Sequence, residues 1–135
     1  MRTIEFRGKR LDTGEWAYGF YTMTGITGRN GGFKPSIVEY DGGSTLPRIV
    51  DENTVGQFTG LHDREGREIY EGDLLSEGQN VGIVIFSPGY FLIDWRENRE
   101  FFSDTLHIHA QYAKVVSTIH DQPADRREKE DGGNV

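Results

Sequence analysis

Histidines near the carboxyl end of the chain are the residues whose spacing comes closest to metal chemistry. His107 and His109 alternate along a segment that we expect to be a strand, so both imidazoles would point to one face. His120 or an acidic residue would have to supply the third ligand that a metal site requires. Nothing in the sequence fixes that ligand, and His-Ile-His equally fits the polar face of a strand. We predict no metal site and no cofactor, although the sequence leaves metal binding by the two histidines open.

The triplet Asp12-Thr13-Gly14 is the one that aspartic proteases use to bring two carboxylates together around a shared proton. Here it occurs once, with Arg10-Leu11 before it and Glu15-Trp16 after it, whereas a catalytic loop of that type is shielded by apolar neighbours. A turn explains the same residues, because Asp and Gly are common in turns. We therefore predict a hairpin turn at this point.

Five carboxylates lie close together in the middle of the chain, namely Asp63, Glu65, Glu68, Glu71 and Asp73. Their spacing does not match a calcium-binding EF-hand loop, whose ligands end in a glutamate at position twelve. The glycine-rich segment 25–32 is not followed by the Lys-Ser/Thr pair of a phosphate-binding loop, and no Gly-x-Ser-x-Gly elbow occurs. Because no catalytic constellation emerges, the sequence predicts a protein that is not an enzyme.

Composition narrows the class of partner and the compartment. Lys and Arg total 15 against 22 Asp and Glu, and the formal charge of -7 disfavours non-specific binding to nucleic acid. The chain has no cysteine, which excludes a disulfide framework and fits a reducing compartment. No run of about 18 apolar residues suggests a membrane span, and the amino terminus lacks a signal peptide. We expect a cytoplasmic protein that does not bind membranes.

Turn residues and aromatic residues are both abundant, which favours short strands. The chain contains 18 Gly, 8 Phe, 6 Tyr and 2 Trp, and glycine suits tight turns while aromatics suit half-buried strands. Thr3–Phe6 and Trp16–Tyr21 are predicted to form a hairpin. The side chains that we expect to be buried in it are Ile4, Phe6, Trp16 and Tyr18. The glycines between Thr24 and Phe33 predict a mobile loop there.

The carboxyl-terminal half is predicted to be a small barrel. Asp63 and Gly66 occupy the ends of a four-residue turn between two strands. From Tyr70 onward the runs YEGDLL, VGIVIF, YFLIDW and HIHAQYAKVVSTI follow one another with turn residues between them. The run VGIVIF is the best candidate for a central strand. Closure of these strands would remove exposed sheet edges. The charged segment 125–135 is predicted to be disordered, because it has too little apolar surface to offset ordering entropy.

Three segments resemble a known family. The central segment ENTVGQFTGLHDREGREIYEGDLL at 52–75, the opening IEFRGKRLDTGEWAYG at 4–19 and the closing VVSTIHDQPAD at 115–125 are similar to the YopX family of phage and prophage proteins. The resemblance implies a barrel of the Src-homology-3-like type in the carboxyl-terminal part and a gene acting inside a bacterial host. It supplies no catalytic residue, and His120 departs from the family's more usual tyrosine. We expect three regions: a β arm at 1–50, the signature and barrel at 51–124, and the tail at 125–135.

The resulting hypothesis is an all-β, non-enzymatic accessory module with little helix. It would bind a host or phage protein, or a second copy of itself. Glutamine and carboxylates on a defined turn exceed what packing needs, so the predicted binding residues are Gln57, Tyr70, Glu71 and Asp73. The alternative is a nucleic-acid surface built on base stacking and phosphate contacts, with Tyr90, Trp95, Arg96 and Arg99. The charge balance makes this alternative the less favoured one.

Overall fold

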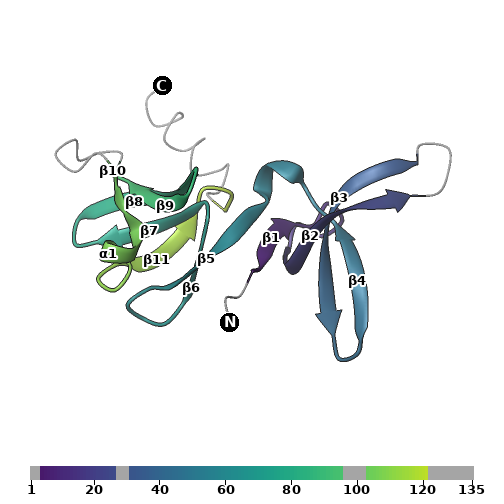
Figure 1. Ribbon diagram of the computed structural model, residues 1–135, viewed down its shortest axis with the longest axis horizontal. Coiled ribbons are helices and arrows are strands. Elements are labelled where there is room, and N and C mark those ends of the chain that lie inside the picture. Colours follow the sequence, from purple (N-terminus) through teal and green to yellow (C-terminus); the bar gives the residue numbers. More distant parts are fainter. Residues whose placement is uncertain (1–3, 27–30, 96–102, 122–135) are drawn as a thin grey trace, which may run out of the picture. The chain divides into compact units, whose positions relative to one another are not determined.

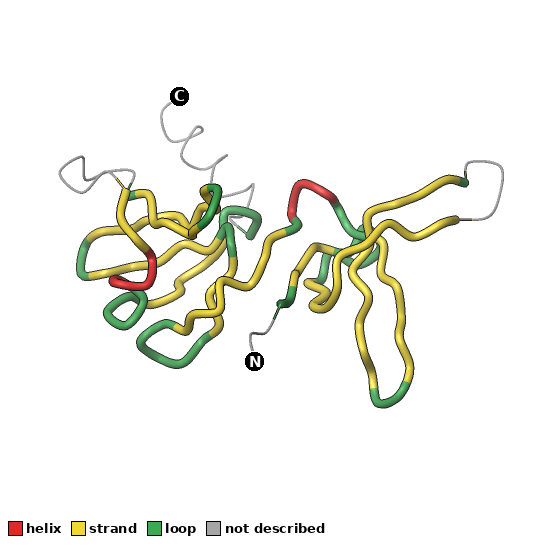
Figure 2. The backbone as a smooth tube through the Cα atoms, in the orientation of Figure 1, coloured by secondary structure: helices red, strands yellow, loops and turns green. Residues whose placement is uncertain are grey.

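The protein is all-β, as the sequence predicts. A computed structural model describes residues 4–26, 31–95 and 103–121. Within these ranges the chain forms antiparallel strands, one short α-helix and one 3-10 turn (Figures 1 and 2). The chain divides into a first unit, Met1–His62 with Glu68–Glu71, and a second unit, Asp63–Arg67 with Gly72–Val135. Among the described residues, no helix is long and apolar enough to cross a membrane.

The first unit is built on a six-stranded antiparallel sheet in the order β4-β3-β2-β1-β5-β6. Its strands are β1 (Phe6–Lys9), β2 (Trp16–Ile26), β3 (Gly32–Asp41), β4 (Ser44–Ile49), β5 (Gly56–His62) and β6 (Glu68–Tyr70). The 3-10 turn η1 (Glu52–Thr54) joins β4 to β5. Pro47 lies on the edge strand β4, where its missing N–H disturbs no central ladder.

A small core holds this sheet together. Ala17, Ile37 and Val50 are fully buried, and Phe6, Tyr21 and Val55 pack against them. Gly19 lets β2 and β3 approach closely, because a Cβ atom there would overlap the carbonyl oxygen of Val38. The predicted turn at residues 12–14 is present between β1 and β2, where the N–H of Gly14 donates to the carbonyl oxygen of Arg10 at 2.8 Å.

Two predictions for the first unit are wrong. The segment from Thr24 to Phe33 is not all loop, because β2 runs to Ile26 and β3 starts at Gly32, with Gly25 opposite Phe33. The paired strand satisfies the backbone of these glycine-rich residues, so the ladder continues where glycine suggested a break. Ile4 and Tyr18 are exposed rather than buried, since β1 begins only at Phe6 and Tyr18 lies on the open face of β2.

The second unit contains a five-stranded antiparallel sheet in the order β10-β9-β8-β7-β11. Its elements are β7 (Asp73–Glu77), β8 (Asn80–Ser87), β9 (Tyr90–Asp94), β10 (Ser103–Thr105), α1 (Leu106–His109) and β11 (Lys114–Thr118). β8 contains the run VGIVIF and is the central strand, which confirms that prediction. In the described ranges β10 and β11 are the two edges of the sheet, so a closed barrel stays a prediction. The tail at 125–135 lies outside the described residues.

The strand predicted across His107 and His109 is wrong. These residues form α1, and the N–H of Ala110 donates to the carbonyl oxygen of Leu106 at 2.8 Å. Leu106, Ala110 and Ala113 are buried. Leu106 and Ala110 are four residues apart and lie on one side of this helical turn, and the N–H of Ala113 donates to the carbonyl oxygen of His109 at 3.0 Å, so the segment turns rather than extends.

The turn predicted at Asp63 and Gly66 is confirmed. The N–H of Gly66 donates to the carbonyl oxygen of Asp63 at 3.0 Å, and Gly66 has a φ of 84°. The Asp63 carboxylate accepts from the backbone N–H groups of Glu65 at 2.8 Å and Arg67 at 2.9 Å through Oδ1, and from Val115 at 2.8 Å through Oδ2. Asp63 is buried. One side chain therefore closes the turn and ties it to β11.

Candidate functional site

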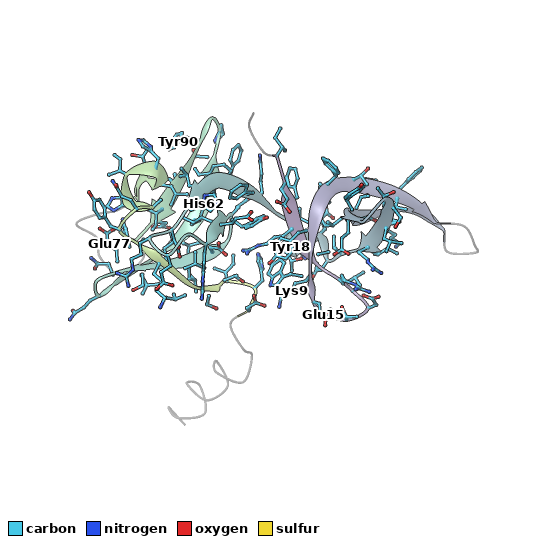
Figure 3. All side chains as sticks on the ribbon, turned by 90° about the horizontal axis from the view of Figure 1, so that it is seen from below. Lys9, Glu15, Tyr18, His62, Glu77 and Tyr90 are labelled. Carbon is cyan, nitrogen blue, oxygen red and sulfur yellow. The ribbon has the colours of Figure 1, made fainter. Side chains whose placement is uncertain are left out.

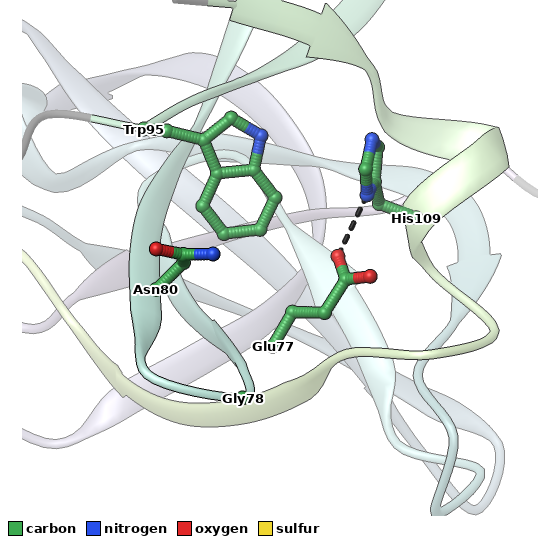
Figure 4. Close-up of a pocket in the computed structure, with 5 residues that line it drawn as sticks. All are labelled: Glu77, Gly78, Asn80, Trp95 and His109. Carbon is green, nitrogen blue, oxygen red and sulfur yellow. Dashed lines mark hydrogen bonds and ion pairs between the residues drawn. The ribbon is translucent and has the colours of Figure 1, made fainter. Parts of the chain in front are cut away.

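A pocket of about 260 Å³ opens in the second unit (Figure 4). Its lining residues are Glu77, Gly78, Asn80, Trp95 and His109. A water molecule needs roughly 10–15 Å³ of such space, so the pocket has room for several waters or for a side chain. It combines an acid, an amide and two aromatic rings within one small unit.

Strand alternation places three of these side chains on one side of the sheet. Glu77 lies two residues after the buried Leu75 and faces Asn80 across the β7–β8 hairpin. Trp95 lies two residues after the buried Ile93, directly beyond the end of β9. Residues two apart in a strand share a face, so the pocket side chains continue the core-facing side of the sheet. Gly78, with a φ of 62°, makes the tight turn that brings β7 back as β8.

His109 holds Glu77 in place. Its Nδ1 lies 2.6 Å from Oε2 of Glu77, with the two side chains 16% and 31% exposed. His109 comes from the last turn of α1, so this contact joins the helix to the β7–β8 hairpin. The imidazole ring also meets the ring of Trp95 edge-on, with 5.3 Å between centroids and 73° between planes. The carboxylate is therefore fixed by a histidine that is itself fixed by a tryptophan.

One oxygen of Glu77 is left for a ligand. In the described part of the chain, the only side-chain partner of Glu77 is His109, which uses Oε2. Figure 4 shows the carboxylate beside Asn80 and Trp95, with the dashed contact running to His109 from one oxygen alone. A carboxylate can accept about four hydrogen bonds. Glu77 thus presents an anchored, half-exposed acceptor at the pocket.

Trp95 forms a rigid wall. The residue is 3% exposed, and its Nε1 is buried without a hydrogen-bond acceptor among the described residues. In Figure 4 the edge of the indole that bears this nitrogen faces His109. A buried ring wedged in this way has little freedom to move, so the pocket keeps its shape without a ligand.

The first unit contains a different aromatic cluster, which surrounds a cation. The guanidinium carbon of Arg7 lies 4.4 Å from the ring centroid of Trp16 and 4.8 Å from that of Tyr70. Arg7 is buried and also donates to the carbonyl oxygen of Glu71 at 3.4 Å. Burial, followed by repulsion from Glu5 and Glu68, raises the pKa of Tyr70 well above its ordinary value. This cluster is part of the structural interior of its unit.

Comparison with known proteins identifies the family. The model of a family described as YopX protein matches residues 5–124. The chain belongs to the YopX family. No curated protein matches this YopX chain significantly. It is similar in fold to the crystal structure of protein EF1440 from Enterococcus faecalis, with a TM-score of 0.52 and 18% identity over 92% of this chain and 98% of that chain. At that identity the likeness shows the fold alone.

The predicted partner-binding residues of this YopX chain divide between the two units. Gln57, Tyr70 and Glu71 belong to the first unit, where the N–H of Glu71 donates to the carbonyl oxygen of Gln57 at 2.9 Å. Asp73 belongs to the second. Tyr70 and Asp73 are buried, while Gln57 and Glu71 are half-buried. Their role in binding a partner stays a prediction.

The alternative nucleic-acid surface is described only in part. Tyr90 is 50% exposed and marks one end of β9 (Figure 3). Trp95 is buried beside His109, and Arg96 and Arg99 lie outside the described residues. Binding of nucleic acid by these residues therefore also stays a prediction.

Sequence reasoning missed the pocket but named two of its walls for other reasons. The sequence suggests His109 as a metal ligand and Trp95 as a base-stacking ring, whereas in the structure the two rings pack together and His109 contacts Glu77. Among the described residues, no three His, Cys, Asp or Glu side chains are placed to hold a metal ion. The SEGQN sequence at 76–80, a turn that carries an acid and an amide beside glycine, was the available signal for the hairpin end of the pocket.

Proposed function

We propose that this YopX-family chain is a non-enzymatic protein-binding module, and that the pocket of its second unit receives a side chain of the partner. The observation that carries the proposal is the carboxylate of Glu77, which is anchored by His109 yet keeps one oxygen for a ligand. Rigid pockets of this kind bind well because little conformational freedom is lost when a ligand enters. Specificity would come from the acid and the amide at the pocket.

The order of the strands supports a small barrel of the Src-homology-3-like type as the scaffold of this site. In the second unit, β11 pairs with β7, the strands β7 to β10 pair in succession, and a short helix separates β10 from β11. In such a scaffold the loops and strand ends carry the recognition residues while the sheet stays fixed. The pocket lies at one such strand end, on the β7–β8 hairpin. Assigning recognition to this hairpin rests on the likeness of the strand order to such a barrel.

The resemblance to phage and prophage proteins suggests the setting. The partner would be a host or phage protein in the bacterial cytoplasm, and a second copy of the chain is the alternative partner. Nucleic acid is less favoured because the net charge is -7 and the ring of Trp95 is buried. A titration with single-stranded DNA and RNA at low salt tests that alternative. Binding that weakens as salt is added would make nucleic acid the favoured partner in place of a protein.

A photo-cross-linking experiment in bacterial cells tests the proposal. A benzoylphenylalanine is placed at Gln79, which is exposed in the β7–β8 turn beside the pocket. The control position is Pro88, exposed in the turn at the other end of β8 and roughly 25–30 Å away along an extended strand. We expect a discrete adduct at position 79, no adduct at position 88, and loss of the adduct when Glu77→Lys is added. An adduct that survives Glu77→Lys, or none specific to position 79, contradicts the proposal.

A further inference from the structure

We infer that the ligand of the pocket is a basic side chain, a lysine ammonium or an arginine guanidinium of the partner protein. This inference rests on the proposed function and adds the chemical class of the ligand. Three properties of the described pocket carry it, namely the acceptor that it presents, its aromatic walls and the absence of Lys and Arg from its described lining.

The first property is the unused carboxylate oxygen of Glu77. Whether His109 donates as a neutral imidazole or as an imidazolium, it occupies Oε2 at 2.6 Å. The other oxygen can only accept, so the ligand must bring an N–H or O–H donor. A donor that also bears positive charge forms the stronger hydrogen bond to a carboxylate, and the side chain is 31% exposed and therefore within reach.

The second property is the pair of rings beside this acid. Trp95 and His109 stand nearly perpendicular to each other, with 73° between their planes. The aliphatic stems of lysine and arginine pack along apolar walls while the charged head reaches a polar group. A basic side chain therefore fits both the walls and the acid.

The third property is the absence of Lys and Arg among the described residues that line the pocket. The lining side chains in that part of the chain are those of Glu77, Asn80, Trp95 and His109. An acidic ligand would face the like charge of Glu77, which costs binding free energy. A neutral amide can donate hydrogen bonds through its NH2 group but gains no charge attraction. The overall charge of -7 further favours approach of a basic partner surface.

The first unit shows how this chain arranges such groups when it supplies the cation itself. Arg7 lies between Trp16 and Tyr70 at 4.4 Å and 4.8 Å from their ring centroids. The second unit provides aromatic walls and an acid, but the lining of its pocket contributes no such cation. The first cluster thus contains its own cation, whereas the described lining of the pocket presents an acid without one.

A nuclear magnetic resonance titration of the full chain tests the ligand class. The chain has two tryptophans, so the indole N–H signals of Trp95 and Trp16 can be assigned with Trp16→Phe. The probes are n-butylammonium, n-butylguanidinium, butanamide and butyrate at equal concentrations in low-salt buffer. We expect saturable shifts of the Trp95 signal with both cations, at dissociation constants on the order of millimolar for ligands of this size. Butanamide should bind at least about fivefold more weakly, and butyrate should not bind.

Two charge-removing variants separate the pocket from the rest of the surface. Glu77→Gln keeps the shape, and its one oxygen can still accept from His109, but its charge is gone and an NH2 group replaces the second oxygen. We expect it to weaken cation binding about tenfold and to change butanamide binding much less, because butanamide can accept from that NH2. Glu65→Gln is the matched control, because Glu65 is an exposed acid of the same unit, 3.5 Å from Lys114. It should leave all four titrations unchanged. Equal binding of butanamide and cations, binding of butyrate, or unchanged cation binding in Glu77→Gln would overturn the inference.

The outcome is separable from that of the proposed function. If the cross-link at position 79 forms and is lost with Glu77→Lys, but the two cations bind no better than butanamide, a partner uses the pocket without a basic side chain, so the function stands and the ligand class fails. If the cations bind but no cross-link forms, the pocket takes basic groups while the protein-binding function fails.

Discussion

The two units of the chain use aromatic rings beside charged groups in opposite ways. In the first unit, Trp16 and Tyr70 enclose the guanidinium of Arg7, so the positive charge that the rings attract is already in place. In the second unit, Trp95 and His109 stand beside Glu77 in an open pocket. We infer that the first cluster stabilises the fold and propose that the second binds a ligand. Four predictions follow the comparison from the largest effect to the smallest.

Removing the cation of the first unit should have the largest effect. Arg7→Met keeps an unbranched stem but removes the charge between two rings, and we expect a loss of about 2–3 kcal/mol in the free energy of unfolding. Denaturant unfolding followed by tryptophan fluorescence measures this loss. Lys9→Met is the control, because the Lys9 ammonium lies farther from Trp16, at 5.5 Å, and contacts one ring of the pair. A loss as large for Lys9→Met would show that enclosure by two rings is not what matters.

In the second unit, Asp63 is the buried charged residue that we compare with Arg7 of the first unit. Asp63→Ala leaves three backbone N–H groups without their acceptor, and we expect a loss of about 2 kcal/mol, since part of the turn can bind water instead. Asp63→Asn can keep the two bonds at Oδ1 but turns an N–H donor toward Val115, so about 1 kcal/mol should be lost. The two variants are compared by denaturant unfolding. Equal losses would mean that the bond to β11 carries the whole effect.

The same carboxylate predicts a pH dependence. Burial alone would raise the pKa of Asp63, but the backbone N–H groups of Val115, Arg67 and Glu65 outweigh burial and hold it below its ordinary value. A lowered folded pKa means stability that is complete above the unfolded pKa, near 3.9, and is lost as pH falls through the folded value. The stability difference between the natural chain and Asp63→Asn should therefore shrink below about pH 4. A difference that stays constant down to pH 2 would contradict this role of the carboxylate.

The smallest effect on stability is expected at the pocket itself. Glu77→Gln weakens a half-exposed contact with His109, and we expect a loss of about 0.5–1 kcal/mol. Denaturant unfolding of Glu77→Gln is compared with that of Arg7→Met. Replacing a residue used for binding should lower the free energy of unfolding much less than replacing a residue that holds the fold together. A loss above about 2 kcal/mol would place Glu77 among the structural residues instead.

Sequence reasoning predicted the elements where local chemistry decides. The Asp63 turn carries its own signal in Asp and Gly, and the apolar run of β8 indicates a central strand in its own right. Sequence reasoning failed where pairing with another strand determines the structure. Gly25 continues a strand because it pairs with Phe33. In the segment 106–113, the i, i+4 and i+7 spacing of the buried Leu106, Ala110 and Ala113 favours a helical turn over the alternation of the histidines. Local pattern and tertiary pairing compete at such points.

The pocket could not be predicted for a related reason. Glu77, Trp95 and His109 belong to a hairpin, a strand end and a helix that are separate along the chain. Only pairing of β7 with β8 and β8 with β9 brings the first two to one face, and only the turn of α1 brings the third. The residues predicted to bind a partner were chosen from one continuous segment, and Tyr70 and Asp73 of that set are buried.

A single titration tests the contrast between the two units most directly. n-Butylammonium is added to the natural chain while the indole N–H signals of Trp16 and Trp95 are followed in the same sample. The enclosed Arg7 already occupies the rings of the first unit, so the account predicts a saturable shift of the Trp95 signal and a stationary Trp16 signal. A stationary Trp95 signal, or equal shifts of both, would contradict it.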